Sequence, residues 1–360
     1  MKFQELTVKA SDGEYKLEFV ENAIESVFSR EKSGNLFFLV DEKIWNLYPD
    51  IRNGLENSGS KYLLIHASEA AKTYGEIGNL LDLILEHSFK RGQKLVAVGG
   101  GITQDIVGFI ASIIYRGVPW IFMPTSLLSQ ADSCIGSKTS INLGKRKNAL
   151  GTFHHPEFIY LDLQFLDTLS ALEIQSGIGE MLKVHIINSV ESFDEIAQNY
   201  ELLLSNKDVM SQAIFNSLNF KKSVIQKDEK DTNIRLVMNY GHTFGHAIEV
   251  ASQFRIPHGL AVTLGMDVAN YISTLLNSET VEYFNRYHPV LMRNLKGLPK
   301  VSFSKEDYLI ALMSDKKNTP TERNFVLLDS YGSPKLQSVP IDSSIPGDSY
   351  DYIMGILSSC

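Results

Sequence analysis

Two histidines, His242 and His246, stand four residues apart in the segment MNYGHTFGHAIE, and a glycine precedes each of them. An α-helix turns once every ~3.6 residues, so the two side chains would share one helix face. That arrangement suits a pair of metal ligands, or one ligand beside a proton-transfer group. Two helix histidines satisfied by ordinary hydrogen bonds are the alternative, and the short motif alone favours that alternative.

A carboxylate and a third imidazole extend this pattern. Glu180 and Lys183 lie three residues apart on an otherwise apolar predicted helix, where a charged side chain is costly to bury unless it is paired or ligating. A surface ion pair is the alternative. His258 follows a proline at a predicted helix start, where a capping or surface histidine is the more common role. One carboxylate and three imidazoles suit Zn²⁺ with an open position, and spacing alone predicts that both His242 and His246 are ligands.

Other segments have residue types that suit anions. VAVGGGITQD runs from a predicted strand into Gly100 and Gly101 and then opens a helix, which is suited to a dinucleotide pyrophosphate. It lacks the GxGxxG pattern, and a tight strand–helix turn is an equal alternative. Asp41 ends an apolar strand, where it is placed either to bind a ribose or to cap a turn. The segment 129–151 is basic in an acidic chain and suggests an anion pocket, with a solvated loop as the alternative.

The elements that must position these residues divide the chain in two. Apolar runs at 35–40, 61–67, 94–100 and 120–125 read as buried strands, with helices at 74–89 and 104–115 between them. Such alternation predicts an α/β, Rossmann-like domain with a parallel sheet over residues 1–162. Helical periodicity dominates residues 163–360, apart from a late strand at 324–329. We expect a mostly α-helical second domain and an active site in the cleft between the two.

The composition excludes several classes of protein. The chain has 360 residues, is 44% hydrophobic and has a net charge of −8, which argues against nucleic acid or an anionic membrane surface as a partner. Its two cysteines give no disulfide framework. The N-terminus has no apolar signal core, and apolar stretches such as 109–115 are too short to span a bilayer. A cytoplasmic enzyme is the expectation.

Several ordered motifs together resemble the 3-dehydroquinate synthase family, within the wider sugar phosphate cyclases. The family pattern NFGHTxGHAIE is present as 239–249, with Tyr240 for Phe. DSSxGGKT is present as DSCIGSKT at 132–139, and AExxK as GEMLK at 179–183. The match runs from about Asp41 to Lys317, which is most of the chain.

The resemblance implies a role for each matching residue. It makes Glu180, His242 and His258 the ligands of Zn²⁺ (or Co²⁺), and His246 a catalytic residue beside the metal rather than a ligand. It implies these NAD-binding residues: Asp41, Glu69, Lys72, Gly100, Gly101, Asp105, Thr125, Ser126, Lys138, Lys147 and Thr168. It implies catalytic roles for Lys138, Lys183, Lys221, Arg235, Asn239 and His246, and substrate contacts by Arg116, Asp132, Asn148 and Lys316.

The implied reaction is the NAD- and metal-dependent cyclisation of 3-deoxy-D-arabino-heptulosonate 7-phosphate to 3-dehydroquinate, with phosphate elimination, in the shikimate pathway. The partner would be this small sugar phosphate, and the resemblance also implies a homodimer. Departures such as Ser137 in place of a glycine leave open a sister cyclase acting on sedoheptulose 7-phosphate or another sugar phosphate. A metal-dependent polyol dehydrogenase and an inactive binding protein of the same fold are the remaining alternatives.

Overall fold

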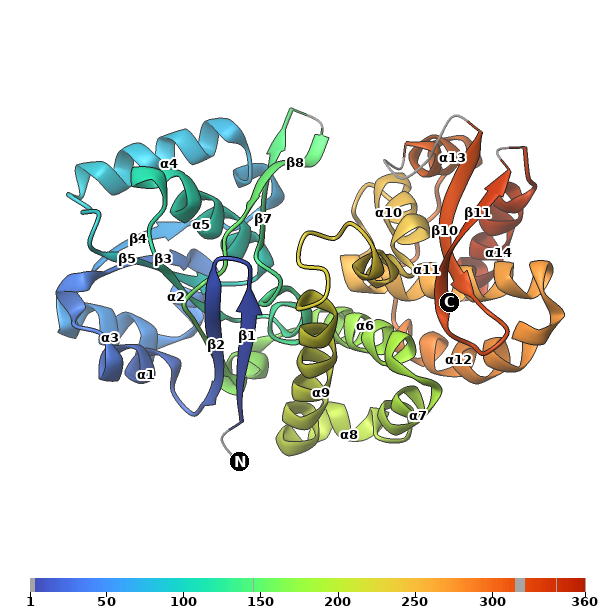
Figure 1. Ribbon diagram of the computed structural model, residues 1–360, viewed down its shortest axis with the longest axis horizontal. Coiled ribbons are helices and arrows are strands. Elements are labelled where there is room, and N and C mark those ends of the chain that lie inside the picture. The colour runs from blue at the N-terminus through green and yellow to red at the C-terminus, as the bar shows by residue number, and fades with distance from the viewer. Residues whose placement is uncertain (1–3, 145, 315–320, 341, 360) are drawn as a thin grey trace. The chain divides into compact units, whose positions relative to one another are not determined.

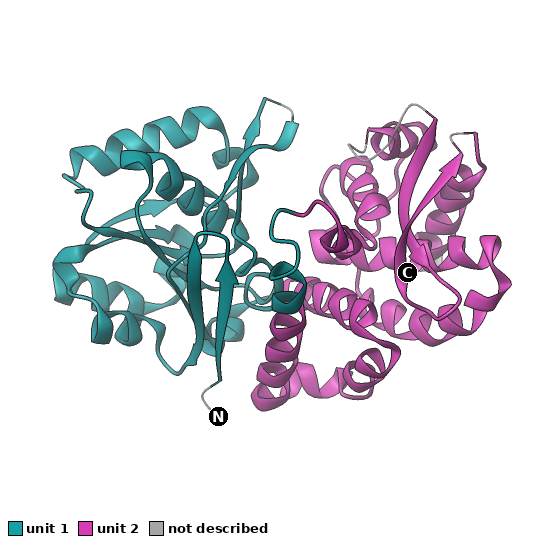
Figure 2. Cartoon of the chain, in the orientation of Figure 1, with its two compact units in different colours: residues 1–169, 221–230 teal, residues 170–220, 231–360 magenta. Residues whose placement is uncertain are grey.

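The computed structural model describes residues 4–144, 146–314, 321–340 and 342–359. The chain forms two compact units, coloured separately in Figure 2. Unit 1 comprises Met1–Leu169 and Lys221–Lys230, and unit 2 comprises Ser170–Phe220 and Asp231–Cys360. The predicted substrate residue Lys316 lies outside the described residues.

Unit 1 is built on a seven-stranded sheet with the order β1-β2-β9-β6-β5-β3-β4. All neighbouring strands pair in parallel except the β1–β2 hairpin at one edge. Strands such as β3 and β6 are apolar and almost wholly buried because helices cover both faces of the sheet. The parallel α/β sheet predicted from the sequence is therefore confirmed, with one antiparallel strand added. The strands are β1 Glu5–Ala10, β2 Gly13–Val20, β3 Leu36–Asp41, β4 Lys61–Ile65, β5 Lys94–Gly99, β6 Trp120–Pro124 and β9 Phe158–Asp162.

The helices of unit 1 lie on opposite faces of this sheet. In Figure 1, α4 and α5 are drawn above the strands, and α1 and α3 below them. From β3 the chain passes to β4 on one side and then returns to β5 on the other side. This reversal is a topological switch point between β3 and β5, and the carboxyl ends of the strands at such a point are the usual ligand position in open α/β sheets. The helices are α1 Ala23–Arg30, α2 Glu42–Leu47, α3 Pro49–Ser58, α4 Tyr74–Glu86 and α5 Gly101–Ile113.

The basic segment of unit 1 forms regular structure rather than a loop. A short turn of π-helix at Ser129–Ser133 precedes the antiparallel hairpin of β7 (Lys138–Leu143) and β8 (Arg146–Phe153). The alternation of small, β-branched and long side chains suits a half-exposed hairpin, but its lysines and glycines hide that pattern in the sequence.

Unit 2 is mostly helical, as predicted, and α11 is its central helix. α11 packs against α6, α10, α12, α14 and β10. It is long and apolar enough to cross a membrane by length and composition alone, a property that the short apolar stretches considered in the sequence did not indicate. In the fold, however, 78% of its apolar window is buried. The elements are α6 Ala171–Asn188, α7 Val190–Gln198, α8 Tyr200–Ser205, α9 Lys207–Ile225, α10 His242–Ala251, α11 His258–Leu276, α12 Val281–Asn294, α13 Lys305–Met313, β10 Glu322–Leu328, β11 Pro334–Pro340 and α14 Ile345–Ser359.

Candidate functional site

Two glycines allow α6 and α11 to touch backbone to backbone. A Cβ placed on Gly179 of α6 would overlap the carbonyl oxygen of Gly259 of α11, and one on Gly259 would overlap the carbonyl oxygen of Ser176. The Gly259 N–H also donates to Ser176 Oγ at 3.0 Å. Glu180 and His258 are chain neighbours of these glycines, so the helix contact brings their side chains together.

Glycines also set the contact between α10 and α11. Gly241 has a left-handed backbone (φ 75°) at the N-cap of α10, and a Cβ on Gly265 of α11 would overlap its carbonyl oxygen. A Cβ on Gly245 would lie 3.0 Å from the carbonyl oxygen of Ala261. The glycine before each histidine is thus explained: it lets the His242–His246 turn pack directly on the first turns of α11.

The carboxylate of Glu180 lies among the imidazoles. Its Oε1 atom is 3.3 Å from His258 Nε2 and 3.7 Å from His242 Nε2. Ligand atoms of His242, His246 and His258 all lie within 4.8 Å of one another. The His242 and His246 rings are 5.3 Å apart between centroids, as expected for one helix face. The structure therefore brings together all four residues that the spacing singled out.

Lys183 supplies the buried partner of Glu180. Its Nζ atom lies 2.5 Å from Glu180 Oε2, and the two side chains are only 3% and 1% exposed, so the alternative of a surface ion pair is wrong. Burial would raise the pKa of Glu180, but Lys183 first, and then His242 and His258, hold it well below its ordinary value. The carboxylate is therefore ionised.

Hydrogen bonds on the outer side of two rings fix their orientation. His242 Nδ1 lies 3.2 Å from the carbonyl oxygen of Tyr240, and His258 Nδ1 lies 3.0 Å from Glu249 Oε2. A ring that donates from Nδ1 keeps the lone pair of Nε2 for a metal. Glu249 was missed as a site residue, although its position seven residues after His242 places both on one face of α10.

These residues fit a divalent cation. Glu180 Oε1 is buried and makes no hydrogen bond of normal geometry to any described residue, which is costly unless another group satisfies it. Burial, followed by Lys183, holds the pKa of His242 well below its ordinary value, so that ring is neutral as a ligand must be. Burial opposes the protonation of His258, but the neighbouring carboxylates of Glu180 and Glu249 raise its pKa to about 10, so a cation that binds this ring must displace a proton from it. One carboxylate oxygen and imidazole nitrogens are a donor set that Zn²⁺ or Co²⁺ accepts.

Three further predicted residues of unit 2 lie on elements next to this cluster in the chain. Arg235 is buried in the short 3₁₀ helix Ile234–Asn239. Asn239 is half-buried and donates to the carbonyl oxygen of Leu236 at 3.1 Å. His246 is exposed on α10 beside the two less accessible rings. An exposed histidine next to a would-be cation is accessible to a bound substrate, as a proton-transfer group must be.

The predicted nucleotide residues of unit 1 gather at one edge of the sheet. Asp41 ends β3 and accepts from the N–H of Lys43 at 2.9 Å, so it also caps α2. Gly100 and Gly101 lie between β5 and α5, and Thr125 and Ser126 follow β6. Because β3, β5 and β6 are parallel neighbours, these residues lie at the same carboxyl edge of the sheet, where α5 also begins.

Four other predicted residues of unit 1, namely Glu69, Lys72, Asp105 and Lys147, have polar partners, in two separate sets. Lys72 is buried, and its Nζ lies 2.6 Å from Asp105 Oδ2. Burial raises the pKa of Asp105, and Lys72 opposes that effect. Glu69 accepts from Asn142 Nδ2 at 2.8 Å and lies 3.8 Å from Lys147 Nζ. These predicted residues are therefore paired polar groups rather than isolated charges.

Most of the remaining predicted residues of unit 1 contact other polar groups, whereas Arg116 stands apart in the chain. Lys221 Nζ lies 2.9 Å from Asp132 Oδ1, and Lys138 is exposed at the start of β7. Asn148 on β8 accepts from Ser140 at 2.9 Å, and Thr168 contacts the hydroxyl of Tyr48 at 2.8 Å. Arg116, in contrast, follows the C-terminal end of α5, roughly 20 Å along that helix from Gly101. Arg116 is thus remote from the Gly100–Gly101 turn, and its role stays a prediction.

The departure at Ser137 has a structural explanation. Ser137 has a left-handed backbone (φ 62°), which suits the glycine of the family pattern. Its hydroxyl donates to Glu229 Oε1 at 3.2 Å, and Glu229 Oε2 accepts from the N–H of Ser11 at 2.8 Å. The serine therefore ties the start of β7 to the segment 221–230 within unit 1.

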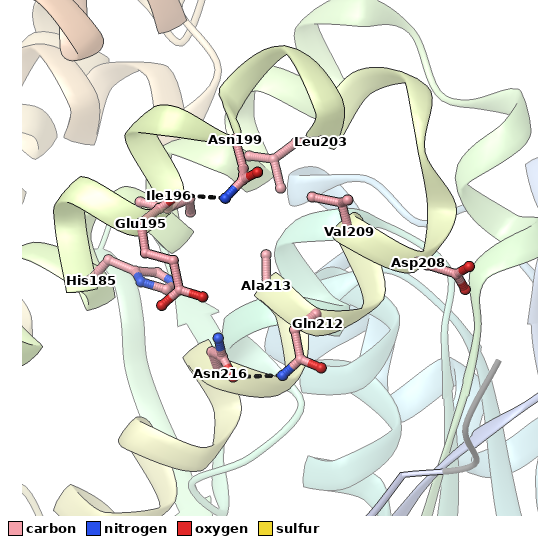
Figure 3. A pocket seen from close by; sticks show the side chains of 10 residues that line it. All are labelled: His185, Glu195, Ile196, Asn199, Leu203, Asp208, Val209, Gln212, Ala213 and Asn216. Atoms are coloured by element: carbon pink, nitrogen blue, oxygen red, sulfur yellow. Dashed lines mark hydrogen bonds between the residues drawn. The ribbon is translucent and has the colours of Figure 1, made fainter. Parts of the chain in front are cut away.

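A separate cavity of about 300 Å³ lies among α6, α7, α8 and α9 of unit 2 (Figure 3). No predicted site residue lines it. Its polar side chains bond within the wall: Asn199 donates to the carbonyl oxygen of Glu195 at 2.9 Å, and Gln212 to Asn216 at 2.8 Å. His185 Nδ1 forms a hydrogen bond of 2.8 Å with Ser192 Oγ. The cavity therefore presents no cluster of the kind formed on α6, α10 and α11.

The fold is shared with solved sugar phosphate cyclases. The crystal structure of 2-deoxy-scyllo-inosose synthase complexed with carbaglucose-6-phosphate, NAD⁺ and Co²⁺ has a TM-score of 0.82 at 24% identity, covering 96% of this chain and 100% of that one. The 2-epi-5-epi-valiolone synthase ValA from Streptomyces hygroscopicus subsp. jinggangensis 5008, with NAD⁺ and Zn²⁺ bound, also has a TM-score of 0.82, at 22% identity and 98% coverage of both chains. These likenesses establish the two-domain cyclase fold.

Comparisons of the sequence identify a more specific family than the comparisons of the fold do. Residues 62–176 match the 3-dehydroquinate synthase N-terminal family, and residues 177–318 match the 3-dehydroquinate synthase C-terminal family. The 3-dehydroquinate synthase of Thermoanaerobacter pseudethanolicus is 34% identical over 345 residues, covering 93% of this chain and 96% of the relative. The chain belongs to the 3-dehydroquinate synthase family, which is an enzyme family. The family, the enzyme class and the fold predicted from the sequence are confirmed.

Proposed function

We propose that this chain catalyses the 3-dehydroquinate synthase reaction, converting 3-deoxy-D-arabino-heptulosonate 7-phosphate to 3-dehydroquinate and phosphate with NAD and Zn²⁺ (or Co²⁺). The observation that carries the proposal is the convergence of Glu180 Oε1 with the Nε2 atoms of His242 and His258, in a chain of this family. Relatives of that name cover nearly the whole chain, and two structures of the same fold contain NAD⁺ with Co²⁺ or Zn²⁺.

In this proposal Glu180, His242 and His258 hold the cation, and the carboxyl edge of the sheet in unit 1 holds NAD. When bound, the cation supplies a Lewis acid beside a substrate hydroxyl, and NAD⁺ accepts and later returns a hydride. The backbone N–H groups at Gly100 and Gly101 suit the pyrophosphate, and Asp41 suits a ribose hydroxyl. Glu69, Lys72, Asp105, Thr125, Ser126, Lys138, Lys147 and Thr168 complete the proposed NAD contacts.

The chain's own groups then handle protons and anionic substituents. His246 is accessible and next to the would-be ligands, so it relays a proton at a substrate hydroxyl. Asn239 orients a hydroxyl by hydrogen bonding. Arg235 suits a carboxylate or phosphate through its planar, bidentate guanidinium, and Lys183 keeps a positive charge beside Glu180.

In unit 1, Lys138 and Lys221 are proposed to bind substrate oxygens, with Asp132 and Asn148 beside them. Asp132 fixes Lys221 through the 2.9 Å ion pair, which limits the conformations of a long side chain. Arg116 and Lys316 stay predictions from the family resemblance. The cytoplasmic location and the homodimer stay predictions of the same kind.

Phosphate release tests the proposal. The purified chain, with NAD⁺ and Zn²⁺ or Co²⁺, is given 3-deoxy-D-arabino-heptulosonate 7-phosphate and, separately, sedoheptulose 7-phosphate, while absorbance is followed for NADH. We expect phosphate from the first substrate alone and no net NADH, because the hydride is returned in each turnover. Phosphate from sedoheptulose 7-phosphate alone would instead assign the sister-cyclase activity.

Two other outcomes identify the remaining alternatives. Net accumulation of NADH without phosphate would indicate a polyol dehydrogenase, a reaction that has no use for Lys138, Lys183, Lys221 and Arg235 together. A chain that holds no metal after purification and turns over neither substrate would be an inactive binding protein. Arg235→Ala sharpens the substrate assignment, since it should raise KM for the carboxylate-bearing substrate at least tenfold and leave NAD affinity unchanged. Equal losses of both would indicate a folding defect.

A further inference from the structure

His258 lies between two carboxylates that compete for its protons. Its Nε2 atom is 3.3 Å from Glu180 Oε1, and its Nδ1 atom is 3.0 Å from Glu249 Oε2. Both carboxylates are shielded, with side-chain exposures of 1% for Glu180 and 12% for Glu249. The ring must be neutral to bind a cation, and a neutral imidazole has one N–H, so in that form it can donate to only one of them at a time.

The choice of tautomer decides whether the ring is able to bind a cation. If Nδ1 carries the proton and donates to Glu249, then Nε2 presents its lone pair beside Glu180 Oε1. If Nε2 carries the proton, it donates to Glu180 and occupies the position that a cation requires. A carboxylate behind a ligating histidine is a known means of fixing the first tautomer.

The fold holds Glu249 rigidly behind His258. Glu249 lies on α10, seven residues after His242, so one helix carries a would-be ligand and the residue that orients the next one. The glycine contacts between α10 and α11 keep the two helices at a fixed and short separation. The 3.0 Å bond is therefore set by helix packing rather than by a mobile side chain on the surface.

From this geometry we propose that Glu249 is a positioning residue for the metal site: it holds the proton of His258 on Nδ1 and aims Nε2 at the cation. The inference rests on the proposed metal site formed by Glu180, His242 and His258. It assigns to Glu249 no contact with substrate or with the reacting atoms.

Metal affinity tests this inference without reference to turnover. Zn²⁺ binding by calorimetry and Co²⁺ binding by visible absorption are measured for the full chain, Glu249→Ala, Glu249→Gln and Glu282→Ala. Glu282 is an exposed glutamate at the start of α12, so its removal is a matched control for the loss of one negative charge. We expect Glu249→Ala to weaken both metals by about 10–100-fold and Glu282→Ala to leave them unchanged.

The conservative variant Glu249→Gln and the tautomer of His258 provide two further measurements. The amide oxygen of Glu249→Gln accepts the same bond, so this variant should regain most of the lost affinity. Long-range ¹H–¹⁵N NMR of the Zn²⁺-loaded chain should show His258 protonated on Nδ1, and Glu249→Ala should lose that single tautomer. Thermal melting of each apo variant checks that the fold is intact.

The outcomes distinguish the positioning role of Glu249 from the existence of the metal site itself. Unchanged metal affinity in Glu249→Ala, or a glutamine variant as weak as the alanine variant, would overturn the positioning role and leave the proposed function in place. A wild-type chain that binds neither Zn²⁺ nor Co²⁺ would overturn the metal site, and this inference with it.

Discussion

The helix cluster of unit 2 and the sheet edge of unit 1, the two proposed binding regions, present different kinds of atoms to a ligand. In unit 2, Glu180, His242 and His258 converge through their side chains, and close helix contacts at glycines hold them. In unit 1, the central groups are backbone atoms at Gly100 and Gly101, while side chains such as Lys72 and Asp105 are paired with each other.

This difference predicts different sensitivities to substitution. A site made of converging side chains fails when one of them is removed, because no neighbour has the same atom in the same place. A site made of backbone N–H groups tolerates changes of nearby side chains but not an added Cβ where the ligand must approach. The following experiments test that contrast, from the largest expected effect to the smallest.

Removing the carboxylate of the helix cluster should have the largest effect. Glu180→Ala is expected to strip the metal and to lower turnover by about a thousandfold or more, since a Lewis acid contributes several kcal/mol to the reaction. NAD affinity, which belongs to unit 1, should remain within about twofold. Metal content, phosphate release and NAD titration measure the three quantities.

Glu180→Gln serves as the control for folding, because the alanine variant also leaves buried Lys183 without its partner. The glutamine variant should lose metal with a smaller change in melting temperature. Full activity in either variant would remove Glu180 from the site.

Gly259→Ala should damage unit 2 through packing alone. The added Cβ would overlap the carbonyl oxygen of Ser176, so α6 and α11 must separate. We expect a loss of about 3 kcal/mol in the free energy of unfolding, at the upper end of overpacking effects, together with weaker metal binding. Chemical denaturation and calorimetry give both values, and a variant as stable as wild type would show that the glycine contact is not required.

Gly101→Ala is the matched substitution in unit 1. Here the nearest atom to the new Cβ is Ser133 Oγ at 3.6 Å, an ordinary contact, so the fold should be preserved. NAD should nevertheless bind about tenfold more weakly, because the Cβ stands where the pyrophosphate approaches the backbone. Metal affinity should not change. Loss of metal together with NAD would contradict the separation of the two regions.

The smallest effect concerns a hydrogen-bonded pair between the middle of α11 and α12. His288 lies 2.9 Å from Asp267, and this hydrogen bond raises its pKa from the ordinary 6.5. A raised pKa means that the pair stabilises the fold fully below pH 6.5, and that the contribution is lost as pH rises through the folded-state pKa. His288→Gln should therefore lower the free energy of unfolding more at pH 6 than at pH 9, by less than about 1 kcal/mol because the ring is partly exposed. Equal differences at both pH values would exclude this linkage.

Much of the fold could be predicted from the spacing of apolar residues along the sequence. Buried apolar runs predicted β3 to β6, and long 3.6-residue patterns predicted α6, α10 and α11 within a few residues. The β7–β8 hairpin was not predicted, because lysines, glycines and serines interrupt its alternation. α11 was not singled out for its length, since its small polar residues divide the apolar run, and tertiary packing buries them.

The candidate site, like the fold, could be predicted only in part from the sequence. The types and spacing of Glu180, His242, His246 and His258 were sufficient to suggest a metal. The outer hydrogen bond of Glu249 was invisible because it joins two helices. The spacing also gave no sign that Glu180 and Lys183 are fully buried as a pair.

The sequence by itself determined the chemical repertoire, the family and the two kinds of secondary structure, because these depend on residue type and local order. Only the tertiary structure decided which Nε2 atoms face Glu180, that glycines set the helix separations, and that Lys72 and Lys221 are already paired. Those facts depend on distances between residues far apart in the chain, and such distances follow from how whole helices and strands pack.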